Sequence, residues 1–280
     1  MKVLITGGAG FLGQRLAKQL LARGELTGPN GAPRRIAELV LLDVVQAHDF
    51  DDARVTARVG DIADRAVLEA AIDARTHAVF HLAAIVSGQA EADFDLGMRI
   101  NLDASRLLLD VCRARGHRPR VVFTSSVAVY GGALPELVRD DTALEPQSSY
   151  GAQKAIAELL LSDYTRRGFV DGRVLRLPTI SVRPGRPNAA ASSFASGIVR
   201  EPLNGEQAVC PVPGGTRLWL LSPRRAIDAL IAGARSSARR ISFTASMPAT
   251  SRSASIMSST VTESPGKLIA RRLPSAAPSS

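Results

Sequence analysis

The 280-residue sequence contains few residues of the types that build disulfide frameworks or metal centres. It has only two cysteines, Cys112 and Cys210, which excludes a disulfide framework and suits a reducing cytoplasm. Its four histidines show no metal-ligand spacing, so we expect no metal. We therefore predict a cytoplasmic protein without a structural metal.

The sequence also lacks a long apolar run and a basic surface pattern. No run approaches the roughly 20 residues of a membrane span, and the apolar residues 3–5 indicate a core strand rather than a signal peptide. Of the net charge of +9, residues 234–280 contribute +6, with seven Lys and Arg against one acid. Residues 1–233 hold 28 basic and 25 acidic residues, without a basic face or interleaved aromatics. We therefore expect neither a membrane nor a nucleic-acid partner.

What the chain does have is a glycine-rich start, KVLITGGAGFLG, at residues 2–13. Residues 3–5 indicate a buried parallel strand, and residues 11–21 carry apolar side chains at helical spacing. Gly7 permits the tight turn, Gly10 lets the main chain approach a pyrophosphate, and Gly13 lets helix and strand pack closely. A flexible turn is the alternative, but a strand and a helix flank the glycines as dinucleotide binding requires.

Acidic residues follow the next two predicted strands. Residues 38–43, ELVLLD, end in Asp43, which would accept hydrogen bonds from an adenosine ribose and repel a 2′-phosphate, so we expect NAD rather than NADP. A surface charge is the alternative for Asp43. After residues 54–60, Asp61 and Ile62 would flank an adenine. Asp61 is predicted equally well as the N-cap of a helix over residues 63–71. Residues 27–35, rich in Gly and Pro, indicate a surface loop.

The fourth predicted strand and the helix after it supply further candidates. Residues 77–84, HAVFHLAA, end in Ala83 and Ala84 beside the expected cofactor. We interpret His81 as a core histidine rather than a catalytic base. Asn101 lies amid apolar residues of a helix predicted over 93–115, where its side chain needs a partner: a cofactor-linked water or a backbone carbonyl.

The residues that indicate chemistry lie near the middle of the chain. The fifth predicted strand, RVVFTSS, ends in Ser126, and a helix beginning within QSSYGAQK carries Tyr150 and Lys154 on one face. A phenol titrates near pH 10, but a nearby ammonium and a nicotinamide cation would lower the pKa of Tyr150. Tyr150 would then exchange a proton with a substrate hydroxyl, held by Ser126, while hydride passes to or from nicotinamide.

Together, the segments GGAGFLG, GDI, HLAA, TSSVAVYG and YGAQK resemble the motifs of the extended short-chain dehydrogenases/reductases, the group that contains sugar-nucleotide epimerases and dehydratases. The resemblance covers about residues 1–232. It implies a Rossmann-type α/β fold with a doubly wound parallel sheet and a partial, smaller C-terminal substrate region. It also implies catalytic roles for Ser126, Tyr150, Lys154 and Asn101. The predicted cofactor-binding residues are Gly7, Gly10, Phe11, Leu12, Gly13, Asp43, Asp61, Ile62, Ala83, Ala84, Tyr150, Lys154 and Pro178.

Residues 173–194, RVLRLPTISVRPGRPNAAASSF, resemble the family's dehydrogenases that oxidise a small sugar acid such as D-erythronate at its C2 hydroxyl. Arginines after this strand would present a guanidinium to the carboxylate, although solvated loop charges are the alternative. The predicted substrate-binding residues are Ser87, Ser126, Tyr150, Arg183, Arg186 and Arg217. The expected activity is an NAD-dependent dehydrogenase, with two alternatives: a nucleotide-sugar epimerase or dehydratase, and a non-catalytic or inactive dinucleotide-binding protein. The expected partners are a small sugar acid and a second copy of the chain in a homodimer.

The sequence changes character at residue 234. Thirteen of the last 47 residues are serine, and the apolar periodicity ends. We predict a dinucleotide-binding domain over 1–177, a partial substrate region over 178–233 and a disordered tail over 234–280. A reading-frame shift near Gly233 would explain the change and would put the activity of this chain in doubt.

Overall fold

The computed structural model describes residues 1–28, 31–185, 188–235, 262–264 and 267–270. Its centre is a six-stranded parallel sheet with the strand order β5-β4-β1-β6-β7-β8. The strands are β1 (Lys2–Thr6), β4 (Glu38–Asp43), β5 (Val55–Val59), β6 (Thr76–His81), β7 (Arg120–Ser126) and β8 (Asp171–Leu177). The order changes direction between β1 and β6, where doubly wound sheets bind ligands beyond the carboxyl ends of their strands. The predicted fold class is confirmed.

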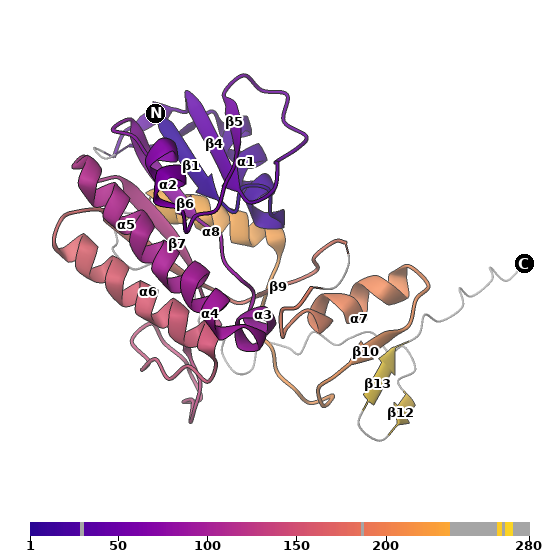
Figure 1. The fold of residues 1–280 in the computed structure, drawn as a ribbon. Helices are drawn as coiled ribbons and strands as arrows, with labels where there is room; N and C mark the ends of the chain where they lie inside the picture. Colours follow the sequence, from indigo (N-terminus) through magenta and orange to yellow (C-terminus); the bar gives the residue numbers. More distant parts are fainter. Residues whose placement is uncertain (29–30, 186–187, 236–261, 265–266, 271–280) are drawn as a thin grey trace, which may run out of the picture.

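Helices cover both faces of the sheet (Figure 1). On one face lie α1 (Phe11–Arg23) and α8 (Pro223–Arg235), and on the other lie α2 (Arg65–Ala71), α5 (Ala104–Arg115) and α6 (Ser149–Arg166). Successive residues of β1 show why: Val3 and Ile5 are fully buried towards α1 and α8, whereas Leu4 is buried towards α2, α5 and α6. A parallel strand covered on both faces therefore consists of a continuous apolar run.

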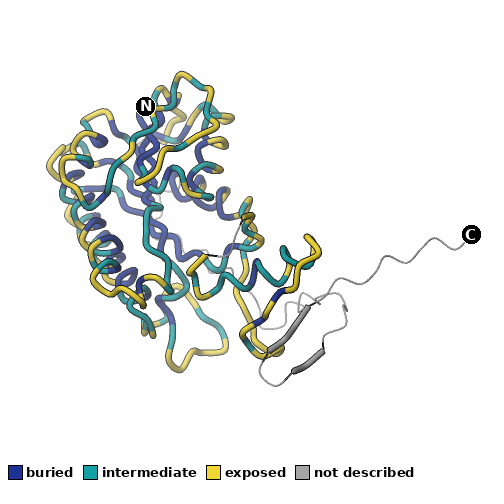
Figure 2. Tube along the Cα trace, turned by 45° about the vertical axis from the view of Figure 1, so that its right-hand side comes forward, coloured by how far each residue is buried: buried dark blue, intermediate teal, exposed yellow. Residues whose placement is uncertain are grey.

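A second, smaller part of the molecule follows β8. It contains β9 (Thr179–Ile180), α7 (Phe194–Leu203), β10 (Ala208–Cys210) and β11 (Leu220–Leu221), and β9 pairs with β11. Figure 2 shows mostly intermediate and exposed residues here, in contrast to the buried strands of the sheet. The chain then returns to the sheet through α8. The predicted substrate region, 178–233, thus includes a helix that packs in the same layer as α1.

Three predicted elements differ from the structure. The second helix begins at Arg65, and its N-cap is Asp64, which accepts a hydrogen bond from Ala66 N at 2.8 Å. The prediction of Asp61 as the N-cap is therefore wrong. The predicted loop 27–35 is partly a hairpin of β2 (Glu25–Thr27) and β3 (Pro33–Arg35). The predicted helix 93–115 consists of α4 (Phe94–Gly97), a π-helical segment η1 (Met98–Asp103) and α5, following the short α3 (Ser87–Ala92).

Most of the predicted tail lies outside the described residues, so its disorder remains a prediction. The described part contains Ala234 and Arg235, which complete α8, and the short strands β12 (Thr262–Ser264) and β13 (Lys267–Ala270). β13 pairs with β10.

Candidate active site

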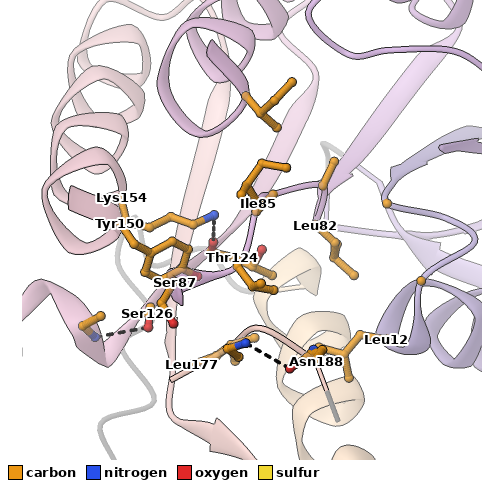
Figure 3. A pocket seen from close by; sticks show the side chains of 18 of the residues that line it. Leu12, Leu82, Ile85, Ser87, Thr124, Ser126, Tyr150, Lys154, Leu177 and Asn188 are labelled. Atoms are coloured by element: carbon orange, nitrogen blue, oxygen red, sulfur yellow. Dashed lines mark hydrogen bonds between the residues drawn. The ribbon is translucent and has the colours of Figure 1, made fainter. Parts of the chain in front are cut away.

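A cavity of about 860 Å³ lies at the carboxyl ends of the strands, above the switch between β1 and β6. All of the predicted cofactor-binding residues line it, from Gly7 to Pro178. Ser87, Ser126 and Arg183 of the predicted substrate set line it as well. The residues predicted to bind a dinucleotide and the residues predicted for proton transfer therefore line the same cavity (Figure 3).

The glycine turn between β1 and α1 forms the first wall of the cavity. Gly7 has a φ of 71°, and a Cβ there would lie 2.8 Å from the backbone N of Ala83. At Gly13 a Cβ would lie 2.1 Å from the carbonyl oxygen of Gly7, so only glycine lets α1 pack on the turn. At Gly10 the space is more open. In the described chain, no side chain caps α1 and no acid lies in its first turn, so its N-terminus is suited to a pyrophosphate.

Asp43 is fixed at the end of β4. Its Oδ2 accepts a hydrogen bond from Ala9 N at 3.0 Å and its Oδ1 accepts one from Val44 N at 2.8 Å. These bonds hold the carboxylate against the glycine turn, where its remaining lone pairs can accept ribose hydroxyls. Asp61 also lines the cavity, and it pairs with Arg99 at 2.7 Å. Burial by itself would raise the pKa of Asp61, but hydrogen bonds from Ala63 N and Arg99 and the charge of Arg99 together outweigh it and hold that pKa below its usual value.

Tyr150, Lys154 and Ser126 converge at the other end of the cavity (Figure 3). The first turn of α6 is capped by Ser148, whose Oγ accepts a hydrogen bond from Gly151 N at 3.1 Å. One turn further on, Lys154 Nζ donates to the carbonyl oxygen of Thr124 at 3.0 Å and lies 5.7 Å from the ring centroid of Tyr150. The i, i+4 spacing predicted from the sequence therefore brings the phenol and the ammonium to one face of α6.

The electrostatics of this group differ from the prediction in one respect. Burial raises the pKa of Tyr150, while a hydrogen bond with Ser126 and the positive charge of Arg183 lower it. Burial also lowers the pKa of Lys154, to about 8. We predicted a lowered pKa for Tyr150, but burial outweighs the effects of Ser126 and Arg183, and the pKa is raised from its ordinary value. Arg183 adds a second positive charge to that of the Lys154 ammonium, which is held on a backbone carbonyl of β7.

Asn101 was predicted to be catalytic, but it does not line the cavity. Its side chain is fully buried, and its Oδ1 accepts a hydrogen bond from Ile85 N at 2.8 Å. Its Nδ2 donates to Ile85 O at 3.2 Å and to Gln153 Oε1 at 2.8 Å. Of the two partners considered from the sequence, the structure shows the backbone carbonyl. Asn101 therefore lies behind the cavity wall, and its catalytic role stays a prediction.

His81 is a core residue, as predicted. Its Nδ1 lies 2.7 Å from Thr6 Oγ1 and its Nε2 lies 3.0 Å from Ser105 Oγ. Burial, together with the charge of Lys154, lowers its pKa to about 3, so the ring is neutral at physiological pH.

The substrate end of the cavity is formed by α3 and the segment after β9. Ser87 Oγ accepts a hydrogen bond from Ala191 N at 3.1 Å, and Arg183 Nε donates to Ile180 O at 3.2 Å. Arg217 is exposed, in the loop between β10 and β11, and does not line the cavity, so its role in substrate binding stays a prediction. Arg186 lies outside the described residues.

Several lining residues were missed by sequence reasoning. Ser125 is buried, and its Oγ has no hydrogen-bond partner within the described part of the chain. Ser125 and Thr124 lie within the TSS segment that pointed to Ser126, so their position at the strand end was the available signal. Asn188 and residues 190–192 also line the cavity, but their small-residue run carried no such signal.

No helix in the described ranges is long and apolar enough to cross a membrane. The model of the NAD dependent epimerase/dehydratase family matches residues 3–220. The chain is 70% identical over 241 residues to D-erythronate dehydrogenase of Cupriavidus necator, covering 86% of this chain and 74% of that protein. It is 52% identical over 228 residues to D-erythronate dehydrogenase of Haemophilus influenzae, covering 81% and 70%.

Solved structures give the same fold. The nucleoside-diphosphate-sugar epimerase from Agrobacterium tumefaciens superposes with a TM-score of 0.77 at 47% identity, over 86% of this chain and 73% of that one. The UDP-glucose 4-epimerase of Thermus thermophilus, in complex with NAD, superposes with a TM-score of 0.73 at 25% identity, over 86% and 77%. With its glycine turn, its Asp43 and its Ser126, Tyr150 and Lys154 in one cavity, the chain belongs to the NAD-dependent epimerase/dehydratase family and has NAD as its cofactor.

Proposed function

We propose that this protein oxidises the C2 hydroxyl of a small sugar acid such as D-erythronate to the 2-oxo acid, with reduction of NAD. The observation that carries the proposal is the place of Arg183, which lines the cavity and acts electrostatically on the phenol of Tyr150. A 2-hydroxy acid carries its carboxylate on the carbon next to the one that is oxidised. A guanidinium beside the proton acceptor can therefore bind that carboxylate and present the C2 hydroxyl to Tyr150.

The residues of the chain divide the chemistry between them. Tyr150, as phenolate, takes the proton of the C2 hydroxyl, and Ser126 holds the same oxygen by a hydrogen bond. The C2 hydride leaves to the nicotinamide of NAD, which yields NADH and a carbonyl at C2. Lys154 stays on the carbonyl oxygen of Thr124 and supplies a positive charge beside the phenol as the phenol changes its charge.

Contacts between two segments at the substrate end of the cavity support a small substrate. The hydrogen bond from Ala191 N to Ser87 Oγ ties residues 188–192 to the start of α3. At Gly88 a Cβ would lie 2.1 Å from the carbonyl oxygen of Ala189, so the two segments touch through their backbones. The names of the two relatives that are 70% and 52% identical support the same substrate.

A nucleotide-sugar epimerase is the second candidate, favoured by the 47% identity to a solved structure of that name. The two reactions differ in what becomes of the reduced cofactor. A dehydrogenase releases NADH in step with its product, whereas an epimerase returns the hydride to the sugar within one catalytic cycle.

The test is the absorbance of NADH at 340 nm with NAD and a panel of four-carbon sugar acids, beside UDP- and TDP-sugars. We expect steady NADH formation with D-erythronate and none with the nucleotide sugars. The variant Arg183→Met should raise KM for the sugar acid at least about tenfold while NAD binding stays unchanged. Interconversion of a nucleotide sugar without net NADH would establish the epimerase instead.

We also propose that the protein acts in the cytoplasm as a homodimer. Both cysteines are free and buried, which suits a reducing compartment. On α6, Ile156 and Leu159 are 41% and 64% exposed, which gives a second copy an apolar helix face to cover. Light scattering of the purified protein should give twice the mass of the chain, and the monomer mass would refute the dimer.

A further inference from the structure

Gln153 is a buried amide on the same helix as Tyr150 and Lys154, with no part in the proposed chemistry. It is 1% exposed, and its Oε1 accepts a hydrogen bond from Asn101 Nδ2 at 2.8 Å. We propose that Gln153 is a positioning residue that orients the carboxamide of Asn101, which in turn fixes the backbone of Ile85 in the cofactor wall of the cavity.

The hydrogen bonds determine which way both amides face. Ile85 N can only donate, so it requires the oxygen of Asn101, and this places Asn101 Nδ2 towards Ile85 O and Gln153. Gln153 must then present its oxygen to Asn101. Asn101 thus binds both the N–H and the carbonyl group of Ile85, as a neighbouring strand would, and the hydrogen bond to Gln153 is a third bond that holds the Asn101 carboxamide in this orientation.

Ile85 is the residue through which the orientation of Asn101 affects the cofactor cavity. It lies in the segment after β6, between Ala84 and Val86, and all three residues line the cavity. The hydrogen bonds that join Gln153, Asn101 and Ile85 therefore connect α6, which carries the proton-transferring phenol, to the cavity wall beside the glycine turn. This connection sets the distance between the phenol and the cofactor independently of the substrate.

Two further observations concern the space around the carboxamide of Gln153. The Nε2 of the same amide has no partner within the described residues. The buried carboxamide of Gln153 therefore makes one side-chain hydrogen bond there, the one that its Oε1 accepts from Asn101. At Gly97, the last residue of α4, a Cβ would lie 2.7 Å from that Nε2 and 3.2 Å from Oε1. Gly97 has ordinary helical angles, φ −58° and ψ −49°, where alanine is the better helix former. The glycine there leaves room for the carboxamide of Gln153.

The test uses the full chain with NAD alone, so it does not depend on the proposed substrate. Gln153→Met keeps the length of the side chain and removes its acceptor, whereas Gln153→Glu keeps the acceptor. We expect the Ile85 amide of Gln153→Met to exchange its hydrogen at least about tenfold faster. NAD should bind about three- to tenfold more weakly by calorimetry. Gln153→Glu should restore both to within about threefold of wild type.

Gly97→Ala approaches the same contact from the other side and should reproduce the faster Ile85 exchange and the weaker NAD binding. The matched control is Gln89→Met, at an exposed position of α3 that does not line the cavity, and it should change neither. Unchanged Ile85 exchange and NAD affinity in both Gln153→Met and Gly97→Ala would overturn the proposal. So would a Gln153→Glu variant that behaves like Gln153→Met, or equal losses in the Gln89→Met control.

Discussion

At the scale of single residues, the reactive phenol lies between two opposing influences. Burial of Tyr150 disfavours its ionised form, whereas Ser126 and Arg183 favour it. Lys154 is itself buried, and its pKa is lowered to about 8. The site therefore depends on Arg183 twice in our proposal, once for the substrate carboxylate and once for the phenolate.

Changing Tyr150 to phenylalanine tests the proton transfer. Tyr150→Phe should reduce turnover by about 10²–10⁴-fold, the usual contribution of a general base, and leave NAD affinity nearly unchanged. Steady-state rates and calorimetry with NAD measure the two effects. The matched control is Tyr164→Phe on the same helix, which loses only a hydrogen bond to Asp110 of 2.6 Å. Turnover of Tyr150→Phe within about tenfold of wild type would assign the proton transfer to another group.

Removing the charge of Arg183 should shift the pH profile. A positive charge favours the phenolate and lowers the pKa of Tyr150, so Arg183→Met should raise that pKa. Oxidation needs the phenolate, and the rising limb of kcat/KM should therefore move to higher pH. Arg183→Lys keeps the charge and should keep the wild-type profile. A profile that is identical in all three proteins would contradict the electrostatic role of Arg183.

At the scale of elements, the site depends on close contacts between segments that meet at the strand ends. The turn after β1 touches both the segment after β6, through Gly7, and α1, through Gly13. Behind it, Thr6 of β1, His81 of β6 and Ser105 of α5 form a buried row of hydrogen bonds. These contacts determine where the cofactor wall lies relative to α6.

Gly13→Ala should separate α1 from the turn. Its Cβ would meet the Gly7 carbonyl oxygen at 2.1 Å and Gly8 Cα at 2.9 Å, and backbone atoms cannot move aside cheaply. We expect a loss of about 1–3 kcal/mol in the free energy of unfolding, although alanine is the better helix former, together with weaker NAD binding. Urea unfolding and calorimetry check both. Gly214→Ala, with open space around it, is the control, and equal stability of the two variants would refute the steric argument.

The buried His81 should make stability depend on pH. Its pKa is lowered to about 3 in the folded state from an ordinary 6.5, so between these values only the unfolded chain takes up the proton. Stability should therefore fall as the pH falls from 6.5 towards 3, by up to about 1.4 kcal/mol per pH unit. His81→Gln should show a smaller slope of Tm against pH between about 6.5 and 4. Equal slopes would show that His81 does not carry this dependence.

At the scale of the whole molecule, the core is completed by a helix from far along the chain. Residues of α8, including Ile227, Leu230 and Ala234, are buried against the sheet, and Arg120 Nη1 donates to the carbonyl oxygen of Ala234. All described residues that line the large cavity precede position 193. The sheet, its covering helices and the described residues that line the cavity are therefore all contained in residues 1–235.

A chain that ends after Arg235 should accordingly fold and bind NAD within about threefold of the 280-residue protein. It would lose the pairing of β13 with β10, so we expect faster hydrogen exchange in β10 alone. Calorimetry with NAD and exchange measurements compare the two chains. Loss of NAD binding on truncation would show that residues after 235 contribute to the cofactor site.

Features that depend on residues close together in the sequence were predicted correctly. The glycine turn, Asp43 at a strand end and the pair Tyr150 and Lys154 were predicted correctly in position, because each depends on a few consecutive residues and on helix or strand periodicity. Family resemblance added Pro178 and Phe11. These local patterns were sufficient to predict a doubly wound sheet with a dinucleotide site.

What only the tertiary structure decided involves partners far apart in the chain. Asn101 meets Ile85 and Gln153, which lie 16 and 52 positions away, so its place behind the wall could not be read from its helix. Arg183 lines the cavity with Tyr150 and Arg217 does not, although both lie in segments that contain Pro and Gly. The periodicity of one segment determines which of its faces is buried, but which side chain meets it there depends on how the elements pack.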